Sequence, residues 1–151
     1  MRELEKMRQW LLSYPAWDDT LQVDFLGAAP GNAGLFPVGV EETGRREDLL
    51  GNLEVDCRCR FLLYRKSFGQ EDGMENAQWL LDFQHWVRQQ SICGAAPVFG
   101  DVPCRERLEA QKGALKTADQ LGVRTYAVTL VVDFVKKYEA GVEAFLNRQG
   151  R

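Results

Sequence analysis

The sequence has few of the residues from which catalytic and metal sites are usually built. Its 151 residues include one histidine, His85, and four cysteines. Cys57 and Cys59 are separated by one residue, whereas Cys93 and Cys104 lack paired spacing. A structural zinc site usually has Cys-x2–4-Cys or His pairs. We therefore predict no metal site, and we interpret the cysteines as reduced thiols that pack as small apolar side chains.

The sequence also lacks segments typical of membrane insertion or phosphate binding. Residues 1–12 are charged throughout, so they do not resemble a signal peptide, and no window approaches the ~18 apolar residues that span a bilayer. Residues 27–34 are glycine-rich but have neither the P-loop nor the dinucleotide-binding spacing. The net charge of −3 argues against a generic nucleic-acid binder. We expect no cofactor, no membrane and no sequence-specific nucleic acid as partner.

Catalysis has only one candidate base. His85 falls within a predicted helix, and Asp82 lies three residues earlier, on the adjacent turn. A general base needs a nucleophile and an orienting group nearby, and the sequence shows no such set. We therefore predict that the protein is not an enzyme. The alternative is a small α+β ligand-binding or enzymatic domain that uses His85 and Asp82.

Hydrophobic periodicity predicts the main elements. Apolar residues at helical spacing predict a helix that ends at Pro15 and a longer helix over 74–91. Alternating patterns predict strands over 21–26, 53–64 and 123–135, and a weaker pattern predicts one over 105–112. Glycine, proline and polar residues predict a loop over 27–37, a short strand beginning at Val38, a polar stretch over 41–52, and a loop or single turn over 113–122.

These elements favour an α+β fold with an antiparallel (mixed) β-sheet, packed by a long central helix and an N-terminal helix. Residues 1–138 are expected to form a single α+β domain. Residues 139–151 are expected to form a C-terminal helical tail, because 139–148 can place its apolar residues on one side of a helix.

Two groups of side chains could be functional or structural. Basic residues on the 53–64 strand and just after it form either a partner surface or a solvated sheet face: Arg58, Arg60, Arg65 and Lys66. Aromatic residues of the central helix are expected in the core: Trp79, Phe83 and Trp86. Other aromatic residues fall in predicted loops, which favours a surface buried against another chain: Trp17, Phe36, Phe68 and Phe99.

Several segments resemble small neck and tail proteins of tailed phages and prophages of Gram-positive bacteria, similar to tail-terminator (tail-completion) proteins. The resemblance covers roughly residues 7–138. It is carried by Leu11-Leu-Ser-Tyr-Pro15, Leu21-Gln-Val-Asp-Phe-Leu-Gly-Ala-Ala-Pro-Gly31 with Pro37-Val38, Tyr64-Arg-Lys-Ser-Phe-Gly69, Asn76-Ala-Gln-Trp-Leu-Leu-Asp-Phe-Gln-His-Trp-Val87 and Thr125-Tyr-Ala-Val-Thr-Leu-Val-Val-Asp-Phe134.

This resemblance implies a structural role. Tail terminators are α+β subunits that assemble head to tail into a ring, typically a hexamer, which caps the tail tube and meets the head connector. The implied partners are other copies of the chain, the tail tube protein and the head–tail connector protein. The implied location is the virion tail or neck, with the host bacterial cytoplasm during assembly. Loops 27–37, 65–75 and 113–122 are the expected contact segments.

Overall fold

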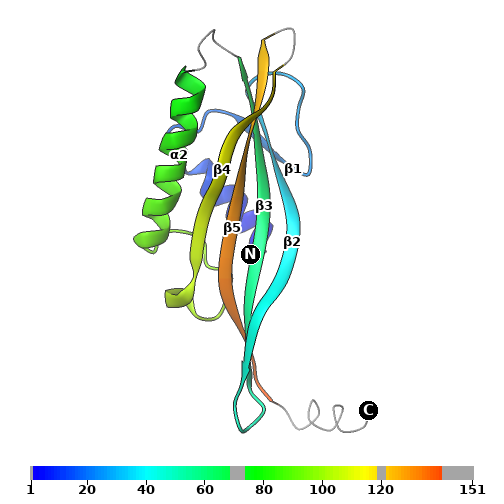
Figure 1. Ribbon diagram of the computed structural model, residues 1–151, viewed down its shortest axis with the longest axis vertical. Coiled ribbons are helices and arrows are strands. Elements are labelled where there is room, and N and C mark those ends of the chain that lie inside the picture. Colours follow the sequence, from blue (N-terminus) through cyan, green and yellow to red (C-terminus); the bar gives the residue numbers. More distant parts are fainter. Residues whose placement is uncertain (1, 69–73, 119–121, 141–151) are drawn as a thin grey trace.

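Residues 2–68, 74–118 and 122–140 are described by the computed structural model of the chain (Figure 1). The elements are α1 (Glu3–Leu12), β1 (Thr20–Val23), β2 (Asn32–Glu47), β3 (Leu53–Phe68), α2 (Met74–Ile92), the short 3-10 helix η1 (Pro103–Arg105), β4 (Arg107–Ala118) and β5 (Val123–Tyr138). Within these residues the strands form a five-stranded sheet in the order β1-β2-β3-β5-β4. Only the β1–β2 pair is parallel. The predicted α+β fold with a mixed sheet is confirmed.

Strands β3 and β5 form the centre of the sheet because both alternate between apolar and polar residues. They are antiparallel and paired along their whole length, from Leu53 opposite Tyr138 to Phe68 opposite Val123. Side chains such as Phe61, Leu63 and Leu130 are almost fully buried on one face. A period of two places every second side chain on the same face, so this face supplies the core.

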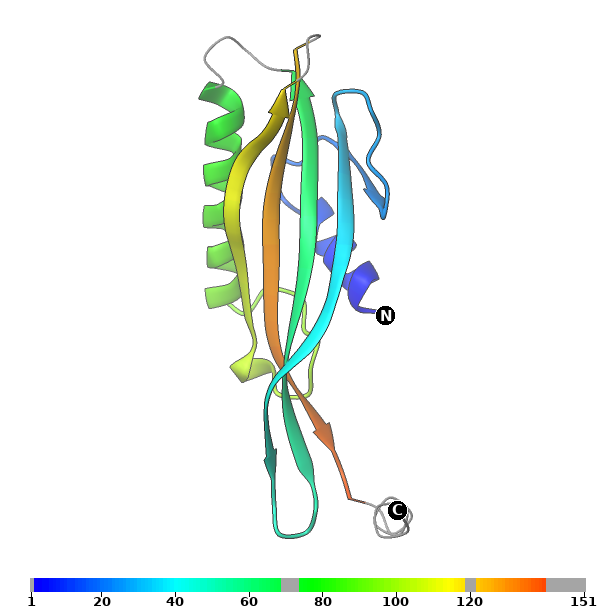
Figure 2. The ribbon, with the colours of Figure 1, turned by 45° about the vertical axis from the view of Figure 1, so that its right-hand side comes forward.

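Both helices pack against that apolar face (Figures 1 and 2). Met7 and Leu11 of α1 and Phe83 and Val87 of α2 are completely buried, as the helical spacing predicts. The two helices meet through Trp10 and Trp86, whose rings stack 4.7 Å apart, and through Tyr14, whose ring contacts Phe83. Of the aromatic residues predicted in the core, Phe83 is fully buried, and Trp79 and Trp86 are half-buried and pack against the core.

The first strand is shorter than predicted. It ends at Val23 because Asp24 adopts a positive φ of 56°, which interrupts the extended backbone. Leu21 is buried as expected, but Phe25, predicted on the same face, is 56% exposed. The strand runs parallel to β2, and a parallel pair needs a connection longer than a hairpin turn, which residues 24–31 provide.

The loop prediction for residues 27–37 is wrong from Asn32 onward, because β2 runs from Asn32 to Glu47. The strand expected to begin at Val38 is part of β2, which also takes in the polar stretch that follows, as far as Glu47. The register between β2 and β3 shifts at Pro37/Gly39 and again at Glu42/Gly44, so these residues mark β-bulges rather than a loop. Gly34 is also a strand residue: a side chain there would collide with the Phe25 backbone oxygen. Glycine thus permits close packing of two backbones.

The second wrong loop prediction concerns residues 113–122. Strand β4 continues to Ala118, with register shifts after Gln111 and after Leu115. Gly113 lies against Gln84 of α2, where a Cβ atom would be only 2.6 Å from the Gln84 Nε2 atom. The segment is a strand because β5 offers it a partner, which local composition does not reveal.

The expected contact loops change accordingly. Residues 32–37, 65–68 and 113–118 are strands and residues 74–75 begin α2, while 69–73 and 119–121 lie outside the described residues. Most of the predicted C-terminal helix, from residue 141 onward, also lies outside them.

Of the four aromatic residues predicted in loops, Trp17 and Phe99 do lie in loops, whereas Phe36 and Phe68 lie in strands β2 and β3. Phe99 is buried against Phe61 and Phe134, Trp17 packs on Trp79 and Phe83, and Phe36 contacts Tyr64 on the open face of the sheet. Phe68 is the exposed member of the set, at 68%. Three of the four therefore have aromatic partners within the chain itself.

The end of the β2–β3 hairpin, residues 41–56, extends beyond both helices (Figure 2). We call this segment the arm and its turn, residues 47–52, the tip. The end of β5 accompanies the arm, because Leu53 and Glu54 pair with Tyr138 and Lys137. The arm is therefore built from three strands rather than from a lone hairpin, which gives it a defined direction.

Candidate functional site

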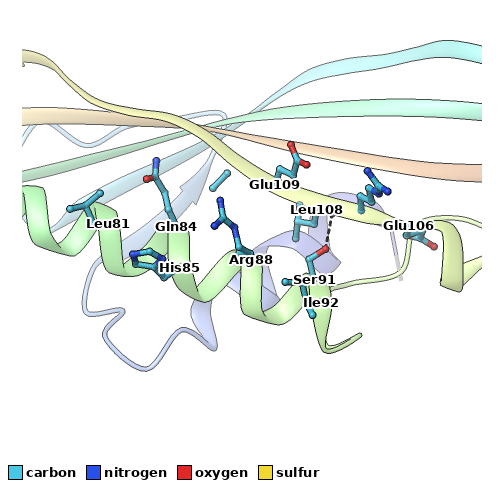
Figure 3. Close-up of a pocket in the computed structure, with 11 residues that line it drawn as sticks. Leu81, Gln84, His85, Arg88, Ser91, Ile92, Glu106, Leu108 and Glu109 are labelled. Carbon is cyan, nitrogen blue, oxygen red and sulfur yellow. Dashed lines mark hydrogen bonds between the residues drawn. The ribbon is translucent and has the colours of Figure 1, made fainter.

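His85 lies on the exposed side of α2 and lines a groove between α2 and β4 (Figure 3). Asp82 does not line this groove. Its Oδ1 atom instead accepts a hydrogen bond of 2.8 Å from Gln78 Nε2, on the preceding turn. Within the described parts of the chain, no hydrogen bond joins His85 to Asp82. The geometry therefore does not bring together the two residues that the enzymatic alternative requires.

The groove between α2 and β4 has a volume of about 590 Å³. Residues 106–110 of the β4 side form one wall. The helix forms the other wall with Leu81, Gln84, His85, Arg88, Ser91 and Ile92. Figure 3 shows Gln84 and Arg88 extending from α2 toward β4.

Local hydrogen bonds hold the two walls of the groove together. The Leu108 backbone N–H donates to Ser91 Oγ over 3.1 Å, so α2 satisfies a backbone group at the edge of β4. The Glu106 carboxylate accepts hydrogen bonds from the backbone N–H groups of Phe99 and Gly100, at 2.7 and 3.1 Å. These bonds fix the groove without using its remaining polar and apolar side chains.

Two kinds of side chain remain available in the groove. Leu81 is 51% exposed and Ile92 is 78% exposed, so α2 presents apolar surface to solvent there. Arg88 and Arg107 form no ion pair with any residue of segments 2–68, 74–118 and 122–140. Arg107 alternates with the buried Leu108, so its side chain lies on the open face of the sheet, where it lines a second pocket with Asp133. The groove itself therefore combines apolar contacts with the guanidinium group of Arg88.

The tip of the arm is a well-ordered turn. Asp48 Oδ1 accepts hydrogen bonds from the backbone N–H groups of Leu50 and Asn52, and Asp48 Oδ2 accepts one from Asn52 Nδ2, all at 2.9 Å. Gly51 supplies the positive φ of 84° that closes the turn. These hydrogen bonds lower the pKa of the Asp48 carboxyl, so it remains ionised. The turn holds Leu49 and Leu50 outward, with Leu49 completely exposed.

The charged face of the sheet is neutralised within the chain. Arg58 pairs with Asp133 at 2.7 Å and Arg60 pairs with Glu41 at 2.6 Å. Nearer the tip, Arg46 and Arg105 form ion pairs with Glu54 and Asp56. Hydrogen bonds from Arg46 lower the pKa of both carboxyl groups. Arg58 and Arg60 therefore do not form the unneutralised basic patch that a nucleic-acid surface uses.

Arg65 does not belong to that charged face. It follows Phe61 and Leu63 in the alternation and is buried on the helix side of the sheet. Its Nε atom donates to Asp19 Oδ2 over 2.5 Å, and its guanidinium lies 4.0 Å from the centre of the Trp79 ring. Burial raises the pKa of the Asp19 carboxyl, and Arg65 opposes that rise. This ion pair connects β3 to the segment after α1.

The cysteines divide into two pairs by exposure. Cys57 and Cys59 are free and buried, as predicted, and burial raises the pKa of both thiols, that of Cys59 to about 11. Cys93 and Cys104 are free but exposed, so they do not act as buried apolar side chains. Among the described residues, no cluster of three or more His, Cys, Asp or Glu side chains could hold a metal ion.

The sequence pattern identified His85 but not the other residues of the groove and of the tip. Leu49 and Leu50 are two adjacent apolar residues in an otherwise polar stretch that ends in Gly51-Asn52, which is a turn signal. Arg88 lies one helical turn after His85, on the same side of α2. Arg107 comes from a distant part of the sequence, and no local pattern could have placed it beside the groove.

No helix in the described residues has the length and apolar character needed to cross a bilayer. The chain matches no protein-family model and no curated protein sequence.

Proposed function

We propose that this protein is a structural subunit of a phage or prophage tail or neck. In this proposal it resembles a tail terminator: copies of the chain assemble into a ring that caps the tail tube and joins it to the head connector. The subunit performs no catalysis. Its place is the virion tail or neck, and it assembles in the cytoplasm of the host bacterium.

The exposed tip of the arm is the observation that best supports this role. A turn fixed by three hydrogen bonds that the Asp48 carboxylate accepts presents Leu49 and Leu50 to solvent at the end of a three-stranded arm. Large apolar side chains in a rigid, projecting position are typical of a protein–protein contact. The resemblance of residues 7–138 to tail terminators and the α+β fold agree with an assembly role.

Light scattering across a concentration series, at low and moderate salt, tests the proposal. A ring of six subunits of 17.2 kDa has a mass of about 103 kDa. We expect a species near this mass and ring-shaped particles in electron micrographs. A chain that stays at 17.2 kDa at every concentration, and that also fails to bind purified tail tubes, would refute the proposal.

A further inference from the structure

We infer that copies of the chain join edge to edge, with β4 of one subunit and β2 of the next paired as neighbouring antiparallel strands. The pairing rests on the self-assembly proposed above and assigns the two surfaces that meet in it. The occupant of the free edge of β4 is thus residues 36–41 of a second copy of this chain. Its support comes from the two free edges, from their level in the sheet and from the groove beside β4.

The outer edge of β4 has backbone groups without a partner. Strand β4 is the last strand at one margin of the sheet. The Leu108 N–H points outward, because it donates to Ser91 Oγ rather than to β5. In an antiparallel ladder every second residue directs both of its backbone groups to the same side, so Ala110 points outward as well. Among the described segments, no hydrogen bond involves the Ala110 N–H or C=O group. Such groups are a template for a further strand.

Strand β2 has the second free edge, at the opposite margin of the sheet (Figure 2). β1 pairs with Asn32–Leu35 alone, so within the described strands β2 has no outer neighbour from Phe36 onward. Val40 lies in the row of paired residues that ends at Leu108, and the alternation across that row directs the Val40 backbone groups outward too. Pro37 offers only its carbonyl group, which is usual for a proline on an edge strand. Val40 is 63% exposed, so its side chain also lacks cover.

The two free edges lie at the same level of the sheet. Two rows of paired residues cross it from β2 to β4: Glu41, Arg58, Asp133 and Arg107 in one, and Phe36, Leu62, Thr129 and Gln111 in the other. Residues 36–41 of β2 are therefore level with residues 107–111 of β4. The β2 segment is one residue longer because of the bulge between Pro37 and Gly39.

The directions of the strands also agree with a ring. The three pairings that separate β2 from β4 are all antiparallel, so β2 and β4 run in opposite directions. Rotation about an axis along the strands adds no shift along that axis, so it brings β2 of one copy beside β4 of another at a matching level. The helices of both copies stay on the same side of the joined sheet. A contact between two different edges is heterologous and closes into a ring when the rotation permits.

The groove between α2 and β4 receives side chains of the added strand. Leu108 and Ala110 belong to the sheet face on which the helices pack, and the groove opens on that side of β4 (Figure 3). Val40 belongs to the same face, because it pairs with a buried residue of β3. A β2 strand beside β4 therefore places Val40 over the groove, where Leu81 and Ile92 are exposed.

Proline at the two edges tests the pairing. Val40→Pro removes an outward N–H from β2, and Ala110→Pro removes one from β4, without loss of a hydrogen bond inside the subunit. Each variant alone has a defect in every contact, so each should remain at 17.2 kDa in light scattering. When the two are mixed, the intact β4 of one meets the intact β2 of the other, and we expect a 1:1 pair of about 34 kDa that cannot grow further.

The matched controls are Val40→Ala and Ala110→Ser, which change the same side chains but keep the N–H groups. Both should still form rings. Circular dichroism and thermal melting check that the proline variants are folded. Amide hydrogen exchange of the natural chain supplies a second measurement that needs no substitution: the Val40 and Ala110 amides should exchange more slowly in assembled than in dilute protein. Equal exchange in both states would refute the pairing even where a proline variant does not fold.

The outcomes separate the edge pairing from the proposed function. If the natural chain forms rings and either folded proline variant still forms them, the pairing is wrong and the proposed function stands. If both variants are monomeric but their mixture forms no pair, the two edges do not meet each other, which also refutes it. A 34 kDa species of Val40→Pro alone would mean that β4 pairs with β4 around a two-fold axis instead. If the natural chain never assembles, alone or on tail tubes, the proposed function itself fails.

Discussion

The buried ion pair between Asp19 and Arg65 tests how burial changes the contribution of an ion pair to the free energy of unfolding. The side chains of Asp19 and Arg65 are 5% and 11% exposed, and their contact is 2.5 Å. Glu41 and Arg60 form a contact of 2.6 Å, but their side chains are 52% and 39% exposed. The two pairs have nearly the same length and differ in solvent access, so they serve as a matched comparison.

Removal of Asp19 should be much more damaging than removal of Glu41. Asp19→Ala leaves the Arg65 guanidinium against the Trp79 ring, and the counterion that remains among the described residues is the exposed Asp18 at 3.6 Å. Breaking a buried pair costs about 3–5 kcal/mol, and Asp18 places this one near the lower end. Glu41→Ala should cost about 0–1 kcal/mol, as is usual for exposed pairs. A loss of about 3 kcal/mol is a large part of the ~5–15 kcal/mol typical of a domain.

Urea unfolding, followed by circular dichroism at pH 7, measures both values, and the double variant Asp19→Leu/Arg65→Met completes the comparison. Since burial already raises the pKa of Asp19, desolvation opposes the ionised pair, and we expect this apolar replacement to be nearly neutral. Equal losses below about 1 kcal/mol for Asp19→Ala and Glu41→Ala would refute the argument, because they would mean that burial does not control the cost.

Three further predictions concern the core, the thiols and acid. Phe83→Ala should destabilise the chain by about 3–5 kcal/mol, because Phe83 is fully buried among four aromatic rings. Phe25→Ala, at an exposed site, should have little effect, and equal urea midpoints for the two variants would contradict the prediction. A thiol reagent at pH 8 should modify two cysteines of the folded chain, Cys93 and Cys104, while the buried pair, with its raised pKa values, reacts only on unfolding; four fast thiols would be inconsistent with the fold. Hydrogen bonds lower the pKa of Asp48 in the folded chain, so this carboxylate stabilises the fold above its ordinary pKa of 3.8, and the stabilisation is lost as the pH falls through the folded pKa. In Asp48→Asn, stability to urea should therefore fall less between pH 5 and pH 2 than in the natural chain. An unchanged acid profile would argue against the turn.

Local pattern predicted the elements whose own residues determine their structure. The alternation of β3 and β5 and the helical spacing of α2 each place a continuous apolar surface on one side, and burial against that surface follows directly. The alternation also contains the position of Arg65, because it lies on the face of Phe61 and Leu63, although composition alone suggested a basic cluster.

Pairing with a neighbouring strand determines the elements that the local pattern does not predict. Residues 38–47 are mostly exposed and contain glycine, and they are strand because β3 provides hydrogen-bonding groups along their whole length. Strand β4 is stabilised in the same way by β5. The groove has a similar origin, because α2 residues such as Arg88 and residues 106–110 line one cavity only through the packing of α2 against β4. A single sequence contains the residues of such a site but not their proximity.

The pairing of β3 with β5 has a consequence for synthesis of the chain. Phe68 is released from the ribosome well before Val123, and Leu53 long before Tyr138, yet these residues are neighbours in the finished sheet. Until β5 emerges, β3 has an open edge of sixteen residues with a row of unsatisfied backbone groups and an apolar face. Distant pairings of this kind form slowly, and nascent chains that carry them are prone to aggregate. The interval between translation of β3 and of β5 is therefore the period when the nascent chain exposes the most surface prone to aggregation.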